Sequence, residues 1–195
     1  MRNIKRVGTR ALIVDLPDLK TVMDFYAALS ASPLEHQTDV VAAARTVLVT
    51  FDSPTATTNA VDVLAGYSPA AADMGTPRDI DIDVRYDGED VDALATSLGM
   101  SPRELIEWHT STTWVAAFGG FAPGFTYCVP EDASRALEIP RRDSPRTAVP
   151  AGAVALAGEF SAVYPRRRGA RDGLRVLAGV PPLLAPGADL RASAG

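Results

Sequence analysis

The residues best suited to chemistry in this chain lie in two segments that are rich in aromatic side chains, glycines and arginines. The first runs from Gly119 to Cys128 (GGFAPGFTYC) and the second from Ile139 to Arg167. Ordinary strands are depleted in glycine and proline, whereas these segments are rich in both. Glycine permits positive φ angles and proline fixes φ. We therefore predict a rigid loop on a β-scaffold, the kind of position where binding sites lie.

The loop of the first segment carries three aromatic rings. They are Phe121, Phe125 and Tyr127, and Pro123 and Gly124 shape the loop between them. Two interpretations are open at this point. The rings could form the wall of a pocket for a small flat ring, or they could pack in the core of a β-barrel.

The arginines of the second segment are candidates for anion recognition. Arg141, Arg142 and Arg146 could bind a carboxylate or phosphate through bidentate hydrogen bonds. They could also pair with acidic groups of a partner subunit, or form a solvated basic face. From Arg141 to Arg175 eight arginines face three acidic residues, a local net charge of +5, while the rest of the chain is near −10.

Histidine and cysteine are scarce. Only His36, His109 and Cys128 are present, so an imidazole acid–base step in the second half of the chain would fall to His109. The alternative is that His109 packs or caps at the end of a helix. These residues cannot form a zinc site of the Cys/His kind, and no metal site is predicted, although carboxylate-bound Mg²⁺ stays open. Cys128 is expected to be a buried filler, because no basic residue is adjacent in sequence.

Composition places the chain among globular proteins. It has 195 residues, 47% hydrophobic and 22% charged, which suits one large domain or two small ones. No apolar run could span a bilayer, and the N-terminus has no signal-peptide pattern, so we predict a cytoplasmic protein without membrane contact. The net charge of −5 argues against nucleic acid as a partner. Lysine occurs only at positions 5 and 20, which excludes a Walker-type phosphate loop or Schiff-base lysine downstream.

The first third of the chain has the pattern of a small α/β unit. Apolar runs predict a strand over residues 11–16 and a strand pair over 40–52. Apolar residues three and four apart predict helices over 19–29 and 57–67. A Gly/Pro/Ala-rich stretch over 67–78 has the composition of a linker.

The second part begins with strict alternation. Residues 79–88 place Ile80, Ile82 and Val84 on one face and acidic residues on the other, which predicts a strand with a solvated face. Two short helices are expected over 90–110, with His109 just past the end of the second. From Thr113 onward, short strands between glycines and prolines indicate a β-barrel or sandwich.

Two more signals define those short helices. Gly99 is expected to close the first. Ser101, Pro102 and Glu104 have the spacing of an N-cap, a first-turn proline and the acid of a capping box for the second.

Five spaced elements cover most of residues 84 to 168. In order they are YDGED (86–90), LGMSPRELIEWHT (98–110), GFAPGFTY (120–127), PRRDSPRTAVPAG (140–152) and LAGEFSAVYPR (156–166). Through these elements the chain resembles the family of the B-type subunit of 5-oxoprolinase, also called allophanate hydrolase subunit 1 or the sporulation-kinase-inhibitor family, a carboxyltransferase domain of the C/D type.

The resemblance implies an α+β chain, with a small N-terminal α/β domain over 1–78 and a cyclophilin-like β-barrel domain over 79–195. It also implies a subunit of an ATP-dependent 5-oxoprolinase complex that opens 5-oxoproline to glutamate and is inactive alone. The expected partners are subunit 2, a C-type subunit with a related cyclophilin-like barrel, a third subunit and the small-molecule substrate. ATP would be used by the complex and not bound through a P-loop here.

Two alternatives accompany this function. One is a carboxyltransferase subunit of allophanate hydrolase or urea carboxylase type, and the other is a non-catalytic inhibitor of a histidine kinase. Under the enzyme interpretations the aromatic rings would hold 5-oxoproline or the ureido ring of biotin, with His109 as the acid–base residue.

The end of the matching region departs from the family pattern. Tyr164 and Arg166 belong to the YPR element of the family pattern. We expect them to line the same end of the barrel as the arginines at 141, 142 and 146. The Ser-Pro-Gly-Gly-Trp that usually follows is replaced by residues 167–179. This departure puts full activity in doubt, but not the fold.

Overall fold

The computed structural model describes residues 2–69, 79–120, 122–144, 146–165 and 175–179. The chain divides into two compact units, and each is described by itself. One consists of residues 1–77 with 118–120, and the other of residues 78–117 with 121–195. The predicted linker lies mostly outside the described residues.

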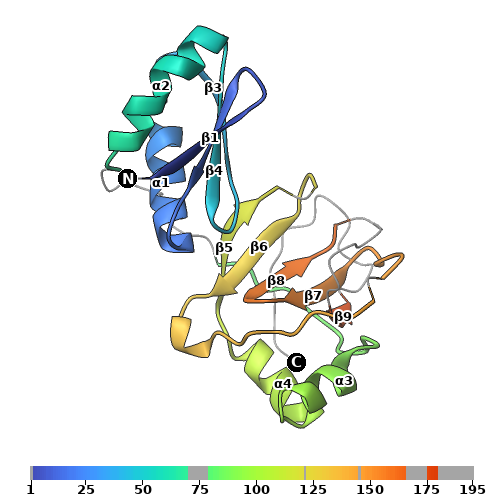
Figure 1. The fold of residues 1–195 in the computed structure, drawn as a ribbon. Helices are drawn as coiled ribbons and strands as arrows, with labels where there is room; N and C mark the ends of the chain where they lie inside the picture. The colour runs from blue at the N-terminus through green and yellow to red at the C-terminus, as the bar shows by residue number, and fades with distance from the viewer. Residues whose placement is uncertain (1, 70–78, 121, 145, 166–174, 180–195) are drawn as a thin grey trace. The chain divides into compact units, whose positions relative to one another are not determined.

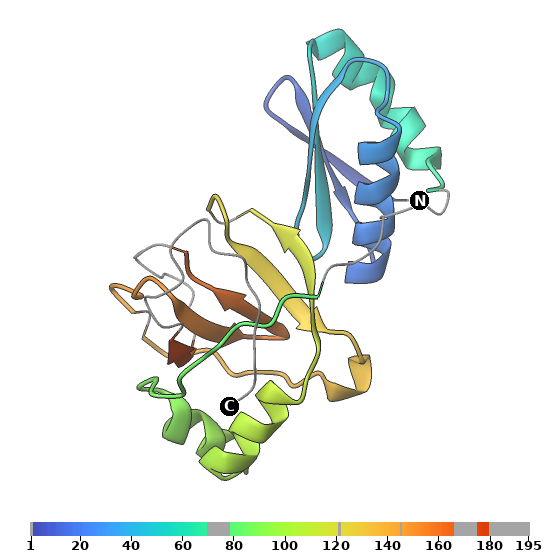
Figure 2. The ribbon, with the colours of Figure 1, turned by 180° about the vertical axis from the view of Figure 1, so that it is seen from behind.

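The first unit is a four-stranded antiparallel sheet with two helices on one face (Figures 1 and 2). The strand order is β1-β2-β4-β3. The strands are β1 (Asn3–Val7), β2 (Ala11–Asp15), β3 (Gln37–Ala42) and β4 (Thr46–Phe51), and the helices are α1 (Leu19–Ala31) and α2 (Pro54–Gly66). The predicted strands and helices of this part are confirmed.

The core of the first unit follows from two periodicities. Alternate residues of β2 and β4 point to the same face, so Leu12 and Val14 are buried beside Val47 and Val49. Helix α1 contributes a stripe with helical spacing: Val22, Phe25 and Leu29. Both helices begin at side-chain caps, Asp18 for α1 and Ser53 for α2.

The second unit combines a helical pair with a five-stranded sheet of order β5-β6-β8-β7-β9. Its elements are α3 (Val91–Ser97), α4 (Pro102–Thr110), β5 (Trp114–Gly119), β6 (Thr126–Pro130), the 3₁₀-helix η1 (Ala133–Arg135), β7 (Ala153–Ala157), β8 (Phe160–Val163) and β9 (Arg175–Gly179). Strands β6, β7, β8 and β9 pair in antiparallel fashion. The chain therefore has the predicted α+β class, and the cyclophilin-like barrel stays a prediction.

Strand β7 is buried on both faces. Ala153 and Ala155 pack against Phe125 and Tyr164 on one side, whereas Leu156 packs with the helical pair on the other. Consecutive strand residues point to opposite faces, so an apolar run (AVALA) is what such a position requires.

The strand predicted over residues 79–88 is wrong. Only Arg85 takes part in a bridge, and the side chains of Ile80 and Ile82 are exposed, at 56% and 43%. Alternation fixes which face each side chain would occupy, but a strand also needs a neighbour that completes its backbone hydrogen bonds. No described residue supplies that neighbour for residues 79–84.

The two short helices are confirmed, with one correction at the end of the second. Ser101 and Glu104 form the reciprocal capping box that the sequence indicates, and Gly99 adopts a φ of +69° after α3. His109 does not follow helix α4 but lies in its last turn, because Thr110 is still helical. No helix in the described ranges is long and apolar enough to cross a membrane.

Candidate functional site

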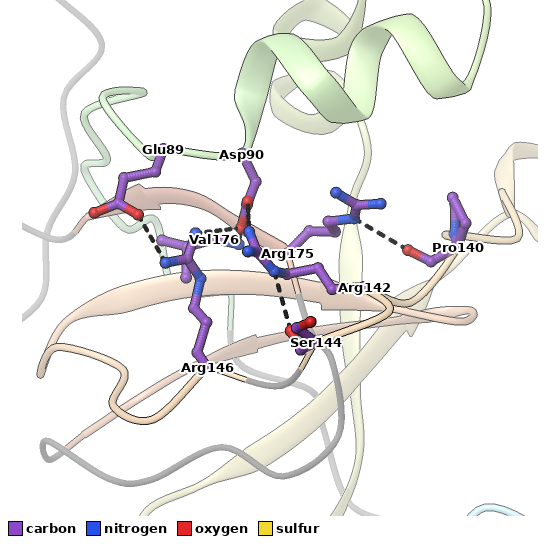
Figure 3. Close-up of polar contacts among 8 residues, drawn as sticks. All are labelled: Glu89, Asp90, Pro140, Arg142, Ser144, Arg146, Arg175 and Val176. Carbon is purple, nitrogen blue, oxygen red and sulfur yellow. Dashed lines mark hydrogen bonds and ion pairs between the residues drawn. The ribbon is translucent and has the colours of Figure 1, made fainter.

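The buried carboxylate of Asp90 is the centre of a polar cluster in the second unit (Figure 3). Asp90 is only 2% exposed and lies directly before helix α3. Arg142 Nη1 donates to its Oδ1, while Arg146 Nη2 and the Val176 backbone N–H donate to its Oδ2 at 2.8 and 2.7 Å. One carboxylate thus joins the start of α3 to the 142–146 segment and to β9.

Asp90 is ionised at neutral pH despite its burial. Burial by itself would raise the pKa of a carboxyl group. Hydrogen bonds from Arg146 and from the Val176 N–H, together with the charge of Arg142, outweigh this effect and lower the pKa of Asp90 below its usual value of 3.8. The cluster is therefore a set of charge-assisted hydrogen bonds.

The predicted arginine group is divided by the structure. Arg146 also donates to Glu89 at 2.7 Å, and Arg142 Nε donates to the Ser144 carbonyl at 3.4 Å. Two of the three arginines are therefore held by carboxylates of their own chain. The geometry favours pairing within the chain for Arg142 and Arg146, and pairing with a partner's acidic groups stays a prediction. Arg141 is exposed and does not take part in the ion pairs of Asp90.

A hollow of about 400 Å³ lies beside this cluster. Its lining is polar and comes from helix α3 and the two residues before it, from the 142–144 segment and from β9. The lining residues are Glu89, Asp90, Ala93, Arg142, Asp143, Ser144 and Arg175. Sequence reasoning missed the charged residues of this lining other than Arg142. In the sequence, Glu89 and Asp90 stand out only as part of the YDGED element. Arg175 is only one of the eight arginines between positions 141 and 175, and Asp143 is only one of the three acidic residues in the same range.

The aromatic residues form a packed cluster. Phe125 is 4% exposed and Tyr164 2%. The ring of Phe125 meets those of Tyr127 and Tyr164 edge to face, with centroids 5.0 and 4.9 Å apart. The cavity beside these rings measures about 20 Å³, which is room for about one water molecule and not for a five-membered ring. The geometry favours the core interpretation over the pocket wall.

Pro123 and Gly124 form the exposed part of the predicted aromatic loop. Gly124 has a φ of +78°. L-residues with a side chain rarely adopt that angle, so glycine is required at this position. Phe121 and Arg166 lie outside the described residues.

His109 is buried between polar and aromatic neighbours. Its Nδ1 lies 2.6 Å from the Tyr86 hydroxyl and its Nε2 lies 3.3 Å from Ser161 Oγ, while its ring centroid is 5.0 Å from that of Trp114. Only 8% of His109 is exposed. Burial lowers the pKa of His109 to about 4 and raises the pKa of Tyr86 to about 12.

These pKa values fix the protonation of the pair at neutral pH. Tyr86 is a neutral phenol, and a neutral imidazole has one donor and one acceptor nitrogen. We assign the proton of Tyr86 to the bond with Nδ1, which leaves Nε2–H to donate to Ser161. Both nitrogens are then engaged, so the geometry favours the packing interpretation of His109. Its catalytic role stays a prediction.

The burial of neutral His109 predicts an acid-dependent loss of stability. Its folded-state pKa of about 4 is below its usual 6.5, so the unfolded chain takes up the proton first as the pH falls. The contribution of neutral His109 to the free energy of unfolding is therefore complete above pH 6.5. It declines by up to about 3 kcal/mol as the pH falls towards 4. Urea denaturation at several pH values measures it.

Two variants control this measurement. His109→Gln should remove the part of the decline that depends on the imidazole. His36→Gln should keep it, because His36 is an exposed residue whose pKa is raised by its hydrogen bond to Asp52. An equal decline in the wild type and in His109→Gln would contradict the assignment.

Cys128 is only partly buried, so the prediction of a buried side chain holds in part. Burial raises the pKa of the Cys128 thiol, which keeps it protonated at neutral pH. In the part of the chain that the structure describes, no three His, Cys, Asp or Glu side chains are grouped to hold a metal ion. The absence of a metal site in the whole chain stays a prediction.

The family is decided by a match over most of the chain. The model of the carboxyltransferase domain, subdomain C and D, matches residues 2–169. The chain belongs to this family. The resemblance carried by the five sequence elements is thereby confirmed.

Two curated relatives share part of the chain. The B-type subunit of 5-oxoprolinase from Bacillus subtilis (strain 168) is 40% identical over 91 residues, which is 45% of this chain and 37% of that protein. The B-type subunit of 5-oxoprolinase from Escherichia coli O157:H7 is 41% identical over 93 residues, 45% of this chain and 41% of that protein. The matches span about two fifths of these relatives.

Solved structures agree on the fold. The Kluyveromyces lactis urea amidolyase matches 92% of this chain and 13% of its own, with a TM-score of 0.72 at 13% identity. The urea carboxylase of the same organism matches 92% of this chain and 19% of its own, with a TM-score of 0.67, also at 13% identity. At this identity the likeness concerns the fold alone.

Proposed function

We propose that this chain is a subunit of an ATP-dependent 5-oxoprolinase complex that opens 5-oxoproline to glutamate, and that it acts only together with a partner subunit. The observation that carries the proposal is the identity of about 40% to two proteins named as B-type subunits of 5-oxoprolinase. The family match over residues 2–169 supports it. A cytoplasmic location is part of the proposal.

The hollows of the described residues support a site shared with a partner. The cavity beside Phe125 has room for about one water molecule, and the larger hollow beside Asp90 is polar and not enclosed. Ring opening requires a substrate held against its catalytic groups with water controlled. A second barrel, from a C-type subunit, would complete such an enclosure.

ATP is assigned to another subunit in this proposal. A Walker-type loop needs a lysine that reaches the phosphates, and no lysine follows position 20. No specific observation favours the urea-carboxylase or kinase-inhibitor alternatives, because the likeness to the yeast enzymes concerns the fold alone.

The proposal predicts a stable heteromeric complex. When the chain is co-expressed with a C-type partner protein, the two should elute together in size-exclusion chromatography at micromolar concentration. The same chain mixed with an unrelated protein of similar size is the control. Separate elution of the co-expressed pair would contradict the dependence on a partner.

A further inference from the structure

The hollow beside Asp90 contains charges that the cluster uses and charges that it does not. Glu89, Asp90 and Arg142 are tied into the network with Arg146. Arg175 is not: its Nε donates to the Pro140 carbonyl at 3.3 Å (Figure 3), and no carboxylate in the described ranges forms an ion pair with it.

Asp143 is an acidic residue that, like Arg175, takes no part in the ion pairs of the Asp90 cluster. It is exposed and lines the same hollow, and none of the described side chains forms an ion pair or hydrogen bond with it. Within the ranges that the structure describes, the hollow therefore holds one guanidinium and one carboxylate that form no ion pair with the rest of the chain. Because Asp90 already binds two arginines, it competes only weakly with an anionic ligand for Arg175.

We propose that this hollow binds the zwitterionic head of an amino acid, with Arg175 on its carboxylate and Asp143 on its ammonium group. A guanidinium presents a planar fork that matches a carboxylate, and the terminal nitrogens of Arg175 supply it. A carboxylate such as that of Asp143 accepts hydrogen bonds from an ammonium group. The volume of about 400 Å³ accommodates a ligand of this size.

This inference rests on the proposed function in its choice of ligand. Hydrolysis adds water across the lactam C–N bond of 5-oxoproline: the carbonyl carbon becomes a carboxylate, and the nitrogen leaves as an amine that takes up a proton. Substrate and product both have a carboxylate for Arg175, but only glutamate has an ammonium group for Asp143. The hollow is thus a product site that discriminates by charge.

The test is a calorimetric titration of the full chain with each of three ligands in turn: L-glutamate, 5-oxoproline and glutarate. Glutarate keeps both carboxylates of glutamate and lacks its amine. Glutamate should bind about tenfold more tightly than either of the other two. Arg175→Gln should weaken the binding of all three ligands by about tenfold or more. Asp143→Asn should weaken the binding of glutamate alone, to the affinity of glutarate.

Two variants guard against loss of folding. Arg103→Gln removes an exposed arginine of helix α4 that pairs with Glu107 and should leave binding unchanged. Arg175→Lys keeps the charge on β9 but loses the fork, so it should bind all three ligands less tightly than the wild type. Thermal melts establish that each titrated variant is folded.

Three results would overturn the inference: no glutamate binding at millimolar concentration, unchanged binding in folded Arg175→Gln or Arg175→Lys, or equal weakening of all three ligands by Asp143→Asn. Turnover of the complex is measured separately. Turnover without glutamate binding in the hollow contradicts this inference alone. Binding with the predicted variant pattern and no turnover contradicts the proposed function alone.

Discussion

Asp90→Ala is expected to lower the free energy of unfolding by about 3–5 kcal/mol, because it removes the carboxylate that Arg142 and Arg146 share. The side chain of Arg146 is 15% exposed, so its charge would be left largely out of water. The backbone N–H of Val176 would also lose its acceptor. Urea denaturation at neutral pH measures the change.

The neighbouring acid provides a matched control. The side chain of Glu89 is 80% exposed although it also pairs with Arg146, so Glu89→Gln should cost less than about 1 kcal/mol. Asp90→Asn keeps the shape and one acceptor oxygen and should fall between the two. Equal effects of Asp90→Ala and Glu89→Gln would contradict the role of Asp90 as the centre of the cluster.

Phe125→Ala is expected to cost about 3–5 kcal/mol of folding stability, because it empties a core position that is 4% exposed. The edge contacts with Tyr127 and Tyr164 would be lost with the ring. Denaturation of the variant is to be compared with turnover of the complex. Turnover should fall only in proportion to the amount of folded protein.

A second aromatic variant sharpens this comparison. Phe160 lines the same small cavity but is only partly buried, so Phe160→Ala should cost less than Phe125→Ala. Loss of turnover in Phe125→Ala at unchanged stability would place the ring in a substrate site and contradict the core interpretation.

The sequence was sufficient where local rules decide the structure. Helix α1 could be predicted because Val22, Phe25 and Leu29 repeat with helical spacing. Helix α4 could be predicted because its capping box involves residues three apart, Ser101 and Glu104. These signals need no knowledge of the rest of the fold.

The sequence was insufficient where distant segments meet. Asp90 and Arg142 are 52 residues apart, so no local pattern shows that their charges pair. The arginines could be recognised as anion-binding, but not that the anion is the chain's own carboxylate. The alternation of residues 79–88 likewise gave no information on whether another strand would pair with it.

The two interpretations of His109 illustrate a further limit. Scarcity of histidine drew attention to the residue, but only the fold shows that Tyr86 and Ser161 engage its two nitrogens. A pKa of about 4 makes His109 a weak base at neutral pH. Its role therefore depends on burial, which sequence spacing does not reveal.

Glutamate release from 5-oxoproline tests most directly whether this chain is a subunit of a 5-oxoprolinase. The assay contains this chain, its co-purifying partner subunits and ATP, with matched samples that lack the chain or the ATP. We predict release of glutamate that requires both. Assembled complex that contains this chain and releases no more glutamate than the sample without it would contradict the assignment to a 5-oxoprolinase.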